Sequence, residues 1–276
     1  MSKRFGTAII AVSGFCLLAT SVLAQPTKAV AKCESSTGST LSKFVGSKGK
    51  CISKCISTGR KTSGPYTDCF SPYGGDTGTC IAGSLKGAEA KAGAGIAKAC
   101  AAAASCPTCY SAQQCSDASG ANPWVQTTEG DIDAPFGPGT GFPDLIWCTE
   151  KGGGTPTKDV AKCEDGVNKA LVKFVGAKNK CYAKCISAAD KAGTGRGVCF
   201  FPGAVDPGVN KCIKDPAKGA EAKAKAAIVK ACPTLPGCYT GTADQVANTF
   251  VSSAEGKIDQ RAPQIACGSP SGAFVD

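Results

Sequence analysis

The sequence predicts an all-α fold: a tandem duplication of a disulfide-stapled antiparallel helical hairpin, with a short third helix in each copy. Three observations lead to this prediction. Long segments of the chain return after about 130 residues. Apolar residues recur at helical spacing, whereas β-branched residues are few and Ala, Lys and Glu dominate. The chain carries 19 cysteines in 276 residues.

The first element is an N-terminal export signal, residues 1–24. Lys3 and Arg4 precede an apolar stretch that ends in the small-x-small sequence Val22-Leu23-Ala24. This order is typical of a secretory signal, so we expect cleavage after Ala24 and a secreted or periplasmic protein. The apolar stretch is shorter than the roughly 20 residues of a membrane-spanning helix. The mature chain has no other such run, so we expect no transmembrane span.

The mature chain contains two matching segments. PTKAVAKCE at 26–34 matches PTKDVAKCE at 156–164, and SKFVGSKGKCISKCIS at 42–57 matches VKFVGAKNKCYAKCIS at 172–187. KGAEAKA occurs unchanged at 86–92 and 218–224. These matches predict a first repeat at 25–148, a flexible glycine-rich linker at 149–155, a second repeat at 156–268 and a C-terminal tail at 269–276.

Each repeat should contain a long helix, a Gly/Pro-rich loop, a second helix and a short third helix. In the second repeat, apolar residues at helical spacing predict the first helix over 157–191. The second should begin near Pro207 and continue to about Cys232, where two prolines follow. The third should lie around 243–259.

The cysteine pattern predicts how the hairpin is stapled. Removal of the signal leaves eighteen cysteines, which favours nine disulfides in an exported protein. Cys181 and Cys185 point in the same direction on a helix, so their partners must come from another element. Cys163 precedes Cys181 by about 27 Å of helix, and Cys212 precedes Cys232 by about 30 Å. An antiparallel hairpin would therefore align these two pairs.

The predicted bridges follow from this alignment. In the second repeat they are Cys181–Cys212, Cys163–Cys232, Cys185–Cys199 and Cys238–Cys267. In the first they are Cys51–Cys80, Cys33–Cys100, Cys55–Cys69 and Cys106–Cys148, with Cys109–Cys115 as an extra local bridge. An exchange of Cys181 with Cys185 is an open alternative. Zinc and iron–sulfur ligation fit the spacing and the exported context less well, so no metal or cofactor is expected.

A row of lysines runs along each predicted first helix. In the second repeat its members are alternately four and seven residues apart and share one narrow sector: Lys158, Lys162, Lys169, Lys173, Lys180, Lys184 and Lys191. The first repeat has Lys28, Lys32, Lys43, Lys50, Lys54 and Lys61, with Ser39 replacing one member. Lys178 lies outside the row, toward the apolar side.

The lysine rows allow two interpretations. They could be a solvated helix face whose alkyl stems shield the hairpin. They could also bind an anionic polysaccharide or another anionic envelope polymer, because the mature chain is basic. Nucleic acid is not expected, because no aromatic residues alternate with the lysines for base stacking.

Several catalytic classes are excluded by composition. The chain has no histidine, which removes Ser-His-Asp and Cys-His catalysis. No carboxylate pair was matched between the two repeats, and Asp131-Ile132-Asp133 is expected to be a surface turn because its counterpart begins with Lys257. We expect a non-catalytic structural or binding protein. The alternative is a thiol–disulfide oxidoreductase that uses Cys106 and Cys109, a C-x-x-C pair.

The sequence resembles a group of uncharacterised exported bacterial proteins. Those proteins carry repeated K-C-x-x-K-C helices, here KCISKC and KCYAKC, followed by Ala/Lys-rich helices such as KGAEAKAKAAIVKAC. The resemblance covers nearly all of both repeats and implies no activity. The C-x-x-x-C spacing is also similar to that of small plant helical hairpin peptides, which are far shorter.

Overall fold

The computed structural model describes residues 26–102, 104–134, 141–201, 203 and 206–268. Within these ranges the regular secondary structure consists of eleven α-helices and two short 3-10 helices, with no strand. The all-α prediction is therefore confirmed. The predicted signal, residues 1–24, and the predicted tail, residues 269–276, lie outside the described residues.

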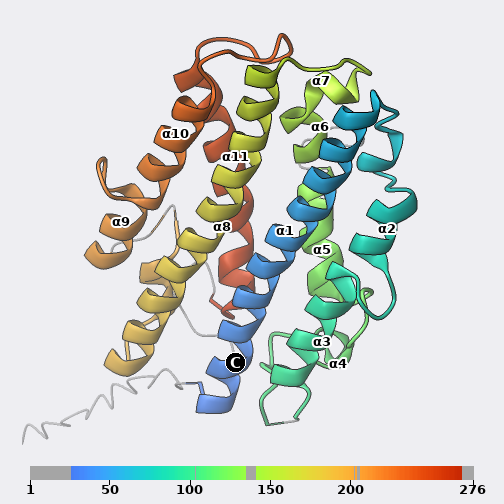
Figure 1. The fold of residues 1–276 in the computed structure, drawn as a ribbon. Coiled ribbons are helices and arrows are strands. Elements are labelled where there is room, and N and C mark those ends of the chain that lie inside the picture. The colour runs from blue at the N-terminus through green and yellow to red at the C-terminus, as the bar shows by residue number, and fades with distance from the viewer. Residues whose placement is uncertain (1–25, 103, 135–140, 202, 204–205, 269–276) are drawn as a thin grey trace, which may run out of the picture.

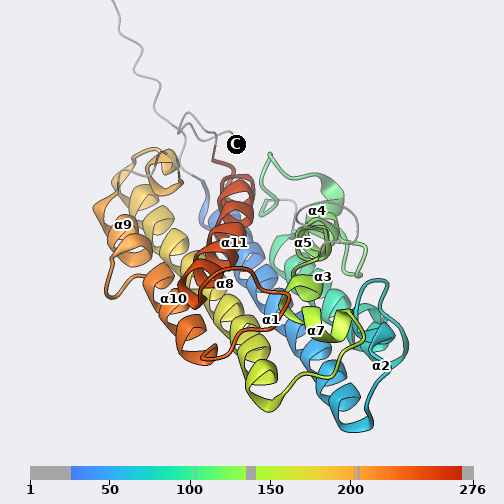
Figure 2. The same cartoon turned by 90° about the horizontal axis from the view of Figure 1, so that it is seen from above.

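Two long antiparallel helices, α1 (Lys28–Thr62) and α8 (Lys158–Ala192), run side by side through the middle of the molecule (Figure 1). On the outer side of α1 lies α3 (Ala88–Cys100), and on the outer side of α8 lies α10 (Ala220–Ala231). Behind this layer, α5 (Pro123–Asp133) packs against α1. In the same rear layer, α11 (Ala243–Ile265) packs against α8 (Figure 2).

Short helices connect these long ones. The remaining α-helices are α2 (Gly75–Ala82), α4 (Ala112–Ser116), α6 (Phe142–Ile146), α7 (Cys148–Lys151) and α9 (Pro207–Lys214). The 3-10 helices are η1 (Thr67–Cys69) and η2 (Arg196–Cys199). We call residues 26–148 the first unit and residues 156–268 the second unit.

The long helices begin and end through matching local signals. Thr27 and Thr157 are N-caps whose hydroxyls accept hydrogen bonds from the backbone N–H groups of Val30 and Val160. At the C-terminal end, Gly193 adopts the left-handed conformation that commonly terminates a helix, with φ of 66°. The observed α8 thus agrees with the predicted helix over 157–191.

The predicted second helix is wrong in one respect, because it is broken into α9 and α10. Pro216 disfavours helical geometry at the residue before it, and Asp215 accordingly has ψ of 125°. The Asp215 carboxylate then accepts hydrogen bonds from the backbone N–H groups of Ala217 and Lys218. The third helix, α11, extends beyond the predicted residue 259 to Ile265.

Disulfides supply much of the cross-linking within each unit. Three predicted bridges are present in the first unit, Cys33–Cys100, Cys51–Cys80 and Cys55–Cys69. Their three counterparts are present in the second, Cys163–Cys232, Cys181–Cys212 and Cys185–Cys199. The exchange of Cys181 with Cys185 does not occur. These bridges join the long helix to the second helix and the loop, as the hairpin geometry requires.

Three predicted bridges are wrong, because two of the bridges that the remaining cysteines form cross between the units. Instead of Cys106–Cys148, Cys109–Cys115 and Cys238–Cys267, the structure has Cys106–Cys115, Cys109–Cys267 and Cys148–Cys238. The prediction assumed that each unit closes on itself. The loop before α4 instead reaches the end of α11, where the Tyr110 hydroxyl donates to the Ile265 carbonyl at 2.5 Å. Likewise, the Tyr239 hydroxyl donates to the Ile146 carbonyl at 2.7 Å.

The contact between α1 and α8 is close where side chains are small. A Cβ atom at Gly46 would lie 3.3 Å from Val172, and one at Gly49 would lie 3.1 Å from the Asn168 side chain. Farther along, the Asn179 amide donates to the Ser42 hydroxyl at 2.5 Å. The glycines of α1 therefore allow the two long helices to approach each other.

Arginines connect the ends of the long helices. Near the C-terminal end of α1, Arg60 bonds to Glu150 of α7 at 2.5 Å and to Glu164 of α8 at 3.0 Å. The Glu150 side chain is fully buried. The predicted flexible linker at 149–155 therefore begins inside a helix that is fixed to both units.

Candidate functional site

The lysine rows lie on the outer surface of the central layer. α1 is covered by α3, α5 and α8, whereas α8 is covered by α1, α10 and α11. The side of each helix that remains uncovered faces the viewer in Figure 1. Every lysine assigned to the two rows is exposed, namely Lys28, Lys32, Lys43, Lys50, Lys54, Lys61, Lys158, Lys162, Lys169, Lys173, Lys180, Lys184 and Lys191.

Part of the two rows meets at a groove between the N-terminal half of α1 and the C-terminal half of α8. The groove has a volume of about 660 Å³, and the end of α11 also lines it. Lys32 and Lys43 approach it from α1, and Lys180 approaches it from α8. We call this feature the basic groove. It brings together lysines that are more than 130 residues apart in the sequence.

Small side chains keep the groove open. Its α1 wall contains Ser35, Gly38, Ser39 and Ser42, and its α8 wall contains Gly176, Ala183 and Ser187. The hydroxyls of Ser35, Ser39 and Ser42 donate to carbonyl groups of α1 itself. Ser39 is the residue that interrupts the lysine row of α1, so the interruption lies in a groove wall.

A buried arginine binds both carboxylates of the groove. Arg196 is 2 % exposed and forms a two-pronged ion pair with Asp190, with distances of 2.7 and 2.9 Å. Its Nη1 atom also donates to Glu34 of α1 at 2.9 Å and to the Ala266 carbonyl at 2.6 Å. Two-pronged pairing of this kind holds a guanidinium in a fixed orientation. The carboxylates therefore face Arg196, and the groove keeps a surplus of positive charge.

The other lysines of the rows do not line this groove. Lys158, Lys162 and Lys169 lie on the N-terminal half of α8, where Asp159 and Asp165 add negative charge to the same helix. The sequence predicts two equivalent rows, whereas the structure gathers only Lys32, Lys43 and Lys180 around a concave surface. The gathering depends on the antiparallel packing of α1 and α8, which the sequence pattern does not contain.

A cluster of buried charges lies apart from the rows and accounts for Lys178. Lys178 is fully buried, and its ammonium lies 2.6 Å from Glu255 Oε1 and 2.6 Å from Asp259 Oδ1. The ring of Phe201 lies 5.4 Å from the ammonium. The Tyr182 hydroxyl donates to Asp259. Lys178 therefore joins α8 to α11 from inside the core, where a buried cation needs such partners.

The first unit contains a corresponding cluster. Lys48 is fully buried, and its ammonium lies 2.5 Å from Glu129 and 2.7 Å from Asp133 of α5. Here the hydroxyl that donates to the aspartate belongs to Tyr73, at 2.7 Å. This pair of carboxylates, which was not predicted from the sequence, is present in both units as Glu129/Asp133 and Glu255/Asp259. Two features of the sequence could have indicated the pair: the repeated Glu-Gly-x-Ile-Asp segment, and the lysine of each unit that lies outside the row, Lys48 or Lys178.

The predicted surface turn at Asp131-Ile132-Asp133 is also wrong. All three residues belong to α5, and Asp133 binds Lys48. The carboxylate of Asp131 accepts hydrogen bonds from Arg261 of α11 at 2.6 and 3.1 Å. Lys257, which occupies the matching position of the second unit, lies 3.8 Å from Asp131. The matching positions thus carry an acid in the first unit and a lysine in the second. These opposite charges face each other where the two units meet.

Two buried carboxyl groups have strongly raised pKa values. Burial, followed by a hydrogen bond with Glu129, raises the pKa of Glu89 to about 7. Burial and the neighbouring Glu150 carboxyl raise the pKa of Glu164 to about 8. Burial would also raise the pKa of Glu255, but hydrogen bonds with Glu221, Lys178 and Lys214 outweigh it and lower that pKa to about 2.

These values predict that stability falls as the pH rises from 5 to 8. Glu89 and Glu164 bind their protons more tightly in the folded chain than in the unfolded chain, so the folded state carries more protons in this window. Raising the pH therefore favours unfolding, by on the order of a few kcal/mol. Urea unfolding at several pH values should show this fall, and Glu89→Gln with Glu164→Gln should flatten it. A stability that rises with pH over this window would contradict the assignment.

The cysteines of the predicted redox pair are not bonded to each other. Cys106 is joined to Cys115, and Cys109 is joined to Cys267. The disulfide that the oxidoreductase alternative requires is therefore not formed. Among the described residues, no group of three or more His, Cys, Asp or Glu side chains is arranged to hold a metal ion.

Within the same described ranges, no helix has both the length and the apolar character needed to span a membrane. Comparisons of the chain with protein-family models, curated proteins and solved structures found no match.

Proposed function

We propose that this is an exported, non-catalytic binding protein that holds a sulfated or phosphorylated polymer in the basic groove. The observation that carries the proposal is the convergence of Lys32, Lys43 and Lys180 on one concave surface of about 660 Å³. The carboxylates that line the groove, Glu34 and Asp190, are already bound to Arg196. A flexible anionic chain would then meet exposed ammonium groups without nearby unpaired acids.

Export of the chain is part of the proposal. Nine disulfides join the eighteen cysteines of the described residues, and such bridges persist in oxidising compartments. The N-terminal sequence through Ala24 supplies the signal, and the matching segments of the two units indicate a duplicated gene segment. An envelope or extracellular location would expose the groove to anionic polysaccharides.

Binding of a defined polyanion tests the groove. We expect the purified protein to bind inorganic polyphosphate and heparin with an affinity that falls as salt rises, because salt screens exposed charges. The variant Lys32→Glu/Lys43→Glu/Lys180→Glu should bind about tenfold more weakly or worse. The reason is that each exposed ion pair contributes up to about 1 kcal/mol, and about 1.4 kcal/mol is a factor of ten.

The matched control changes the same total charge elsewhere in the rows. Lys158→Glu/Lys162→Glu/Lys169→Glu alters three exposed lysines of α8 that do not line the groove. The affinity of this variant for polyphosphate and heparin should remain within about threefold of that of the unsubstituted protein at 0.15 M salt. The reason is that charges beyond a Debye length of about 8 Å are screened. Equal losses in the two variants would show that net charge, and not the groove, attracts the polymer.

A further inference from the structure

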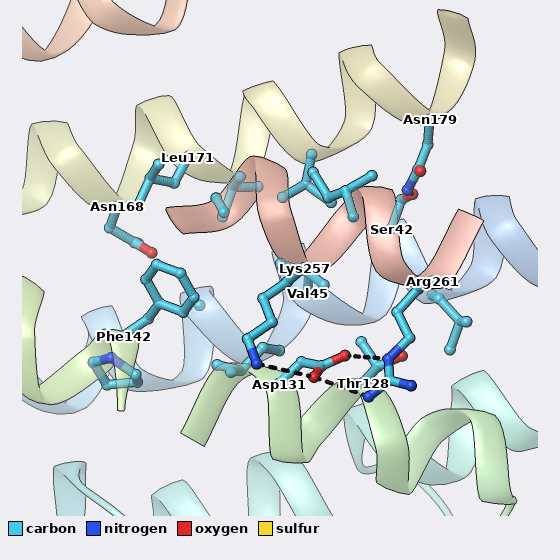
Figure 3. Close-up of a pocket in the computed structure, with 18 of the residues that line it drawn as sticks. Ser42, Val45, Thr128, Asp131, Phe142, Asn168, Leu171, Asn179, Lys257 and Arg261 are labelled. Atoms are coloured by element: carbon cyan, nitrogen blue, oxygen red, sulfur yellow. Dashed lines mark hydrogen bonds and ion pairs between the residues drawn. The ribbon is translucent and has the colours of Figure 1, made fainter. Parts of the chain in front are cut away.

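An apolar cavity of about 130 Å³ lies between the two units, behind the contact of α1 with α8 (Figure 3). Each unit contributes side chains from matching positions of its long helix and its rear helix. These are Leu41 and Leu171, Val45 and Val175, and Ile132 and Ile258. These aliphatic pairs, together with Phe142 and Trp147, make most of the wall apolar. The cavity exists only because the units are packed together.

One end of the cavity is polar and reaches solvent. Figure 3 shows Lys257 and Arg261 descending from α11 toward Asp131 on α5. The Lys257 and Arg261 side chains are 30 % and 26 % exposed, whereas the Asp131 side chain is 11 % exposed. A ligand could therefore enter at this end and leave its head group beside these three side chains.

The charges at the polar end do not balance. Arg261 donates hydrogen bonds to both oxygens of Asp131, at 2.6 and 3.1 Å, so its positive charge already balances that carboxylate. Lys257 lies 3.8 Å from the same carboxylate, which is too long for a good hydrogen bond. Two cations thus face one anion among the described residues that line the cavity. The ammonium of Lys257 can accept an anionic head group as a further partner.

We propose that this cavity binds a small anionic amphiphile. Its tail would be an apolar group about as large as a benzene ring or a six-carbon chain, because a dry apolar cavity of about 150 Å³ binds benzene. Its head would be a carboxylate or sulfate that lies against Lys257. The tail fills space between Val45 and Val175, and the head replaces water at the polar end.

This site is separate from the basic groove, although the two are neighbours. Ser42, Asn179, Ala262 and Ile265 line both, and the hydrogen bond from Asn179 to Ser42 lies where they adjoin. The cavity is lined mainly by apolar side chains, whereas most of the side chains that line the groove are small, polar or charged. The proposed ligand of the cavity contacts Lys257, which does not line the groove, so the two proposals can be tested separately.

The test compares three six-carbon probes by isothermal titration calorimetry. Hexanoate, 1-hexanol and hexylamine share a tail and differ in the charge of the head. We expect hexanoate to bind best, by about tenfold over hexylamine. Lys257→Met should weaken hexanoate binding by about tenfold, so that hexanoate no longer binds more tightly than hexylamine. Lys169→Met, an exposed control on α8, should leave the affinities for hexanoate and hexylamine unchanged.

A second variant tests the tail. Ala254 lies in the cavity wall and is 7 % exposed, so Ala254→Leu should fill the cavity and abolish binding of every probe. Its melting temperature shows whether the variant is folded. If Ala254→Leu disturbs the fold, Val45→Ile, a smaller filling change, should still reduce hexanoate affinity. Absence of hexanoate binding by the original protein, or equal binding of hexanoate and hexylamine, would overturn the proposal.

Discussion

Replacement of Lys178 by methionine is expected to lower the free energy of unfolding by about 3–5 kcal/mol. Methionine fills a similar volume but removes the cation that lies 2.6 Å from both Glu255 and Asp259. These carboxylates lie at the contact of α11 with α8, and their side chains are only 13 % and 19 % exposed. Urea unfolding followed by circular dichroism would measure the loss.

Two further variants show whether the loss comes from the buried charge. Lys180→Met removes an exposed lysine two residues away and should change stability by less than about 0.5 kcal/mol. The triple variant Lys178→Met/Glu255→Gln/Asp259→Asn should recover part of the loss, because it leaves no unpaired charge in the cluster. Similar, small effects of Lys178→Met and Lys180→Met would refute the structural role of Lys178.

The second large effect is expected from removal of the bridge between Cys163 and Cys232. Its cysteines are 69 residues apart, both are buried, and they join α8 to the end of α10. The double variant Cys163→Ala/Cys232→Ala should lose about 4 kcal/mol, because the bridge restricts a long loop of the unfolded chain. The midpoint of thermal unfolding should fall accordingly.

A short bridge provides the comparison. Cys106 and Cys115 are only 9 residues apart, so Cys106→Ala/Cys115→Ala should lose about 2.5 kcal/mol by the same relation. The order of the two losses is the test. A larger loss at the short bridge would show that restriction of the unfolded chain is not the main contribution of these disulfides.

Features set by local sequence could be predicted. The spacing of apolar residues predicted α8, and the similar spans of Cys163 to Cys181 and Cys212 to Cys232 predicted the bridge between Cys163 and Cys232. These features depend on residues within one unit and on helix geometry. The break between α9 and α10 could not be predicted from the apolar spacing, because Pro216 lies inside an otherwise helical pattern and acts only on the residue before it.

Features set by the packing of the two units could not be predicted. Nothing in the chain order tells whether Cys148 meets a cysteine of its own unit or Cys238 of the other. The groove arises only because antiparallel packing sets Lys43 opposite Lys180. The contact of Asp131 with Lys257 could not be predicted for the same reason. When the two units are aligned, these residues occupy matching positions, so the alignment shows only a change of charge and not a contact.

The role of two glycines in α1 becomes clear only from the packing of the helices. Gly46 and Gly49 lower the helix propensity of α1. In the structure they let α1 approach Val172 and Asn168 of α8, and Gly49 also lines the apolar cavity. The same residues thus weaken one helix and permit the contact on which both candidate binding sites depend.

The most direct test of the account is a disulfide map of the purified protein, obtained by protease digestion without reduction and mass spectrometry of the linked peptides. We expect peptides that join Cys109 to Cys267 and Cys148 to Cys238, with none of the eighteen cysteines from Cys33 to Cys267 open to alkylation. These two bridges join the first unit to the second. A peptide that joins Cys238 to Cys267, or free thiols at these positions, would contradict it.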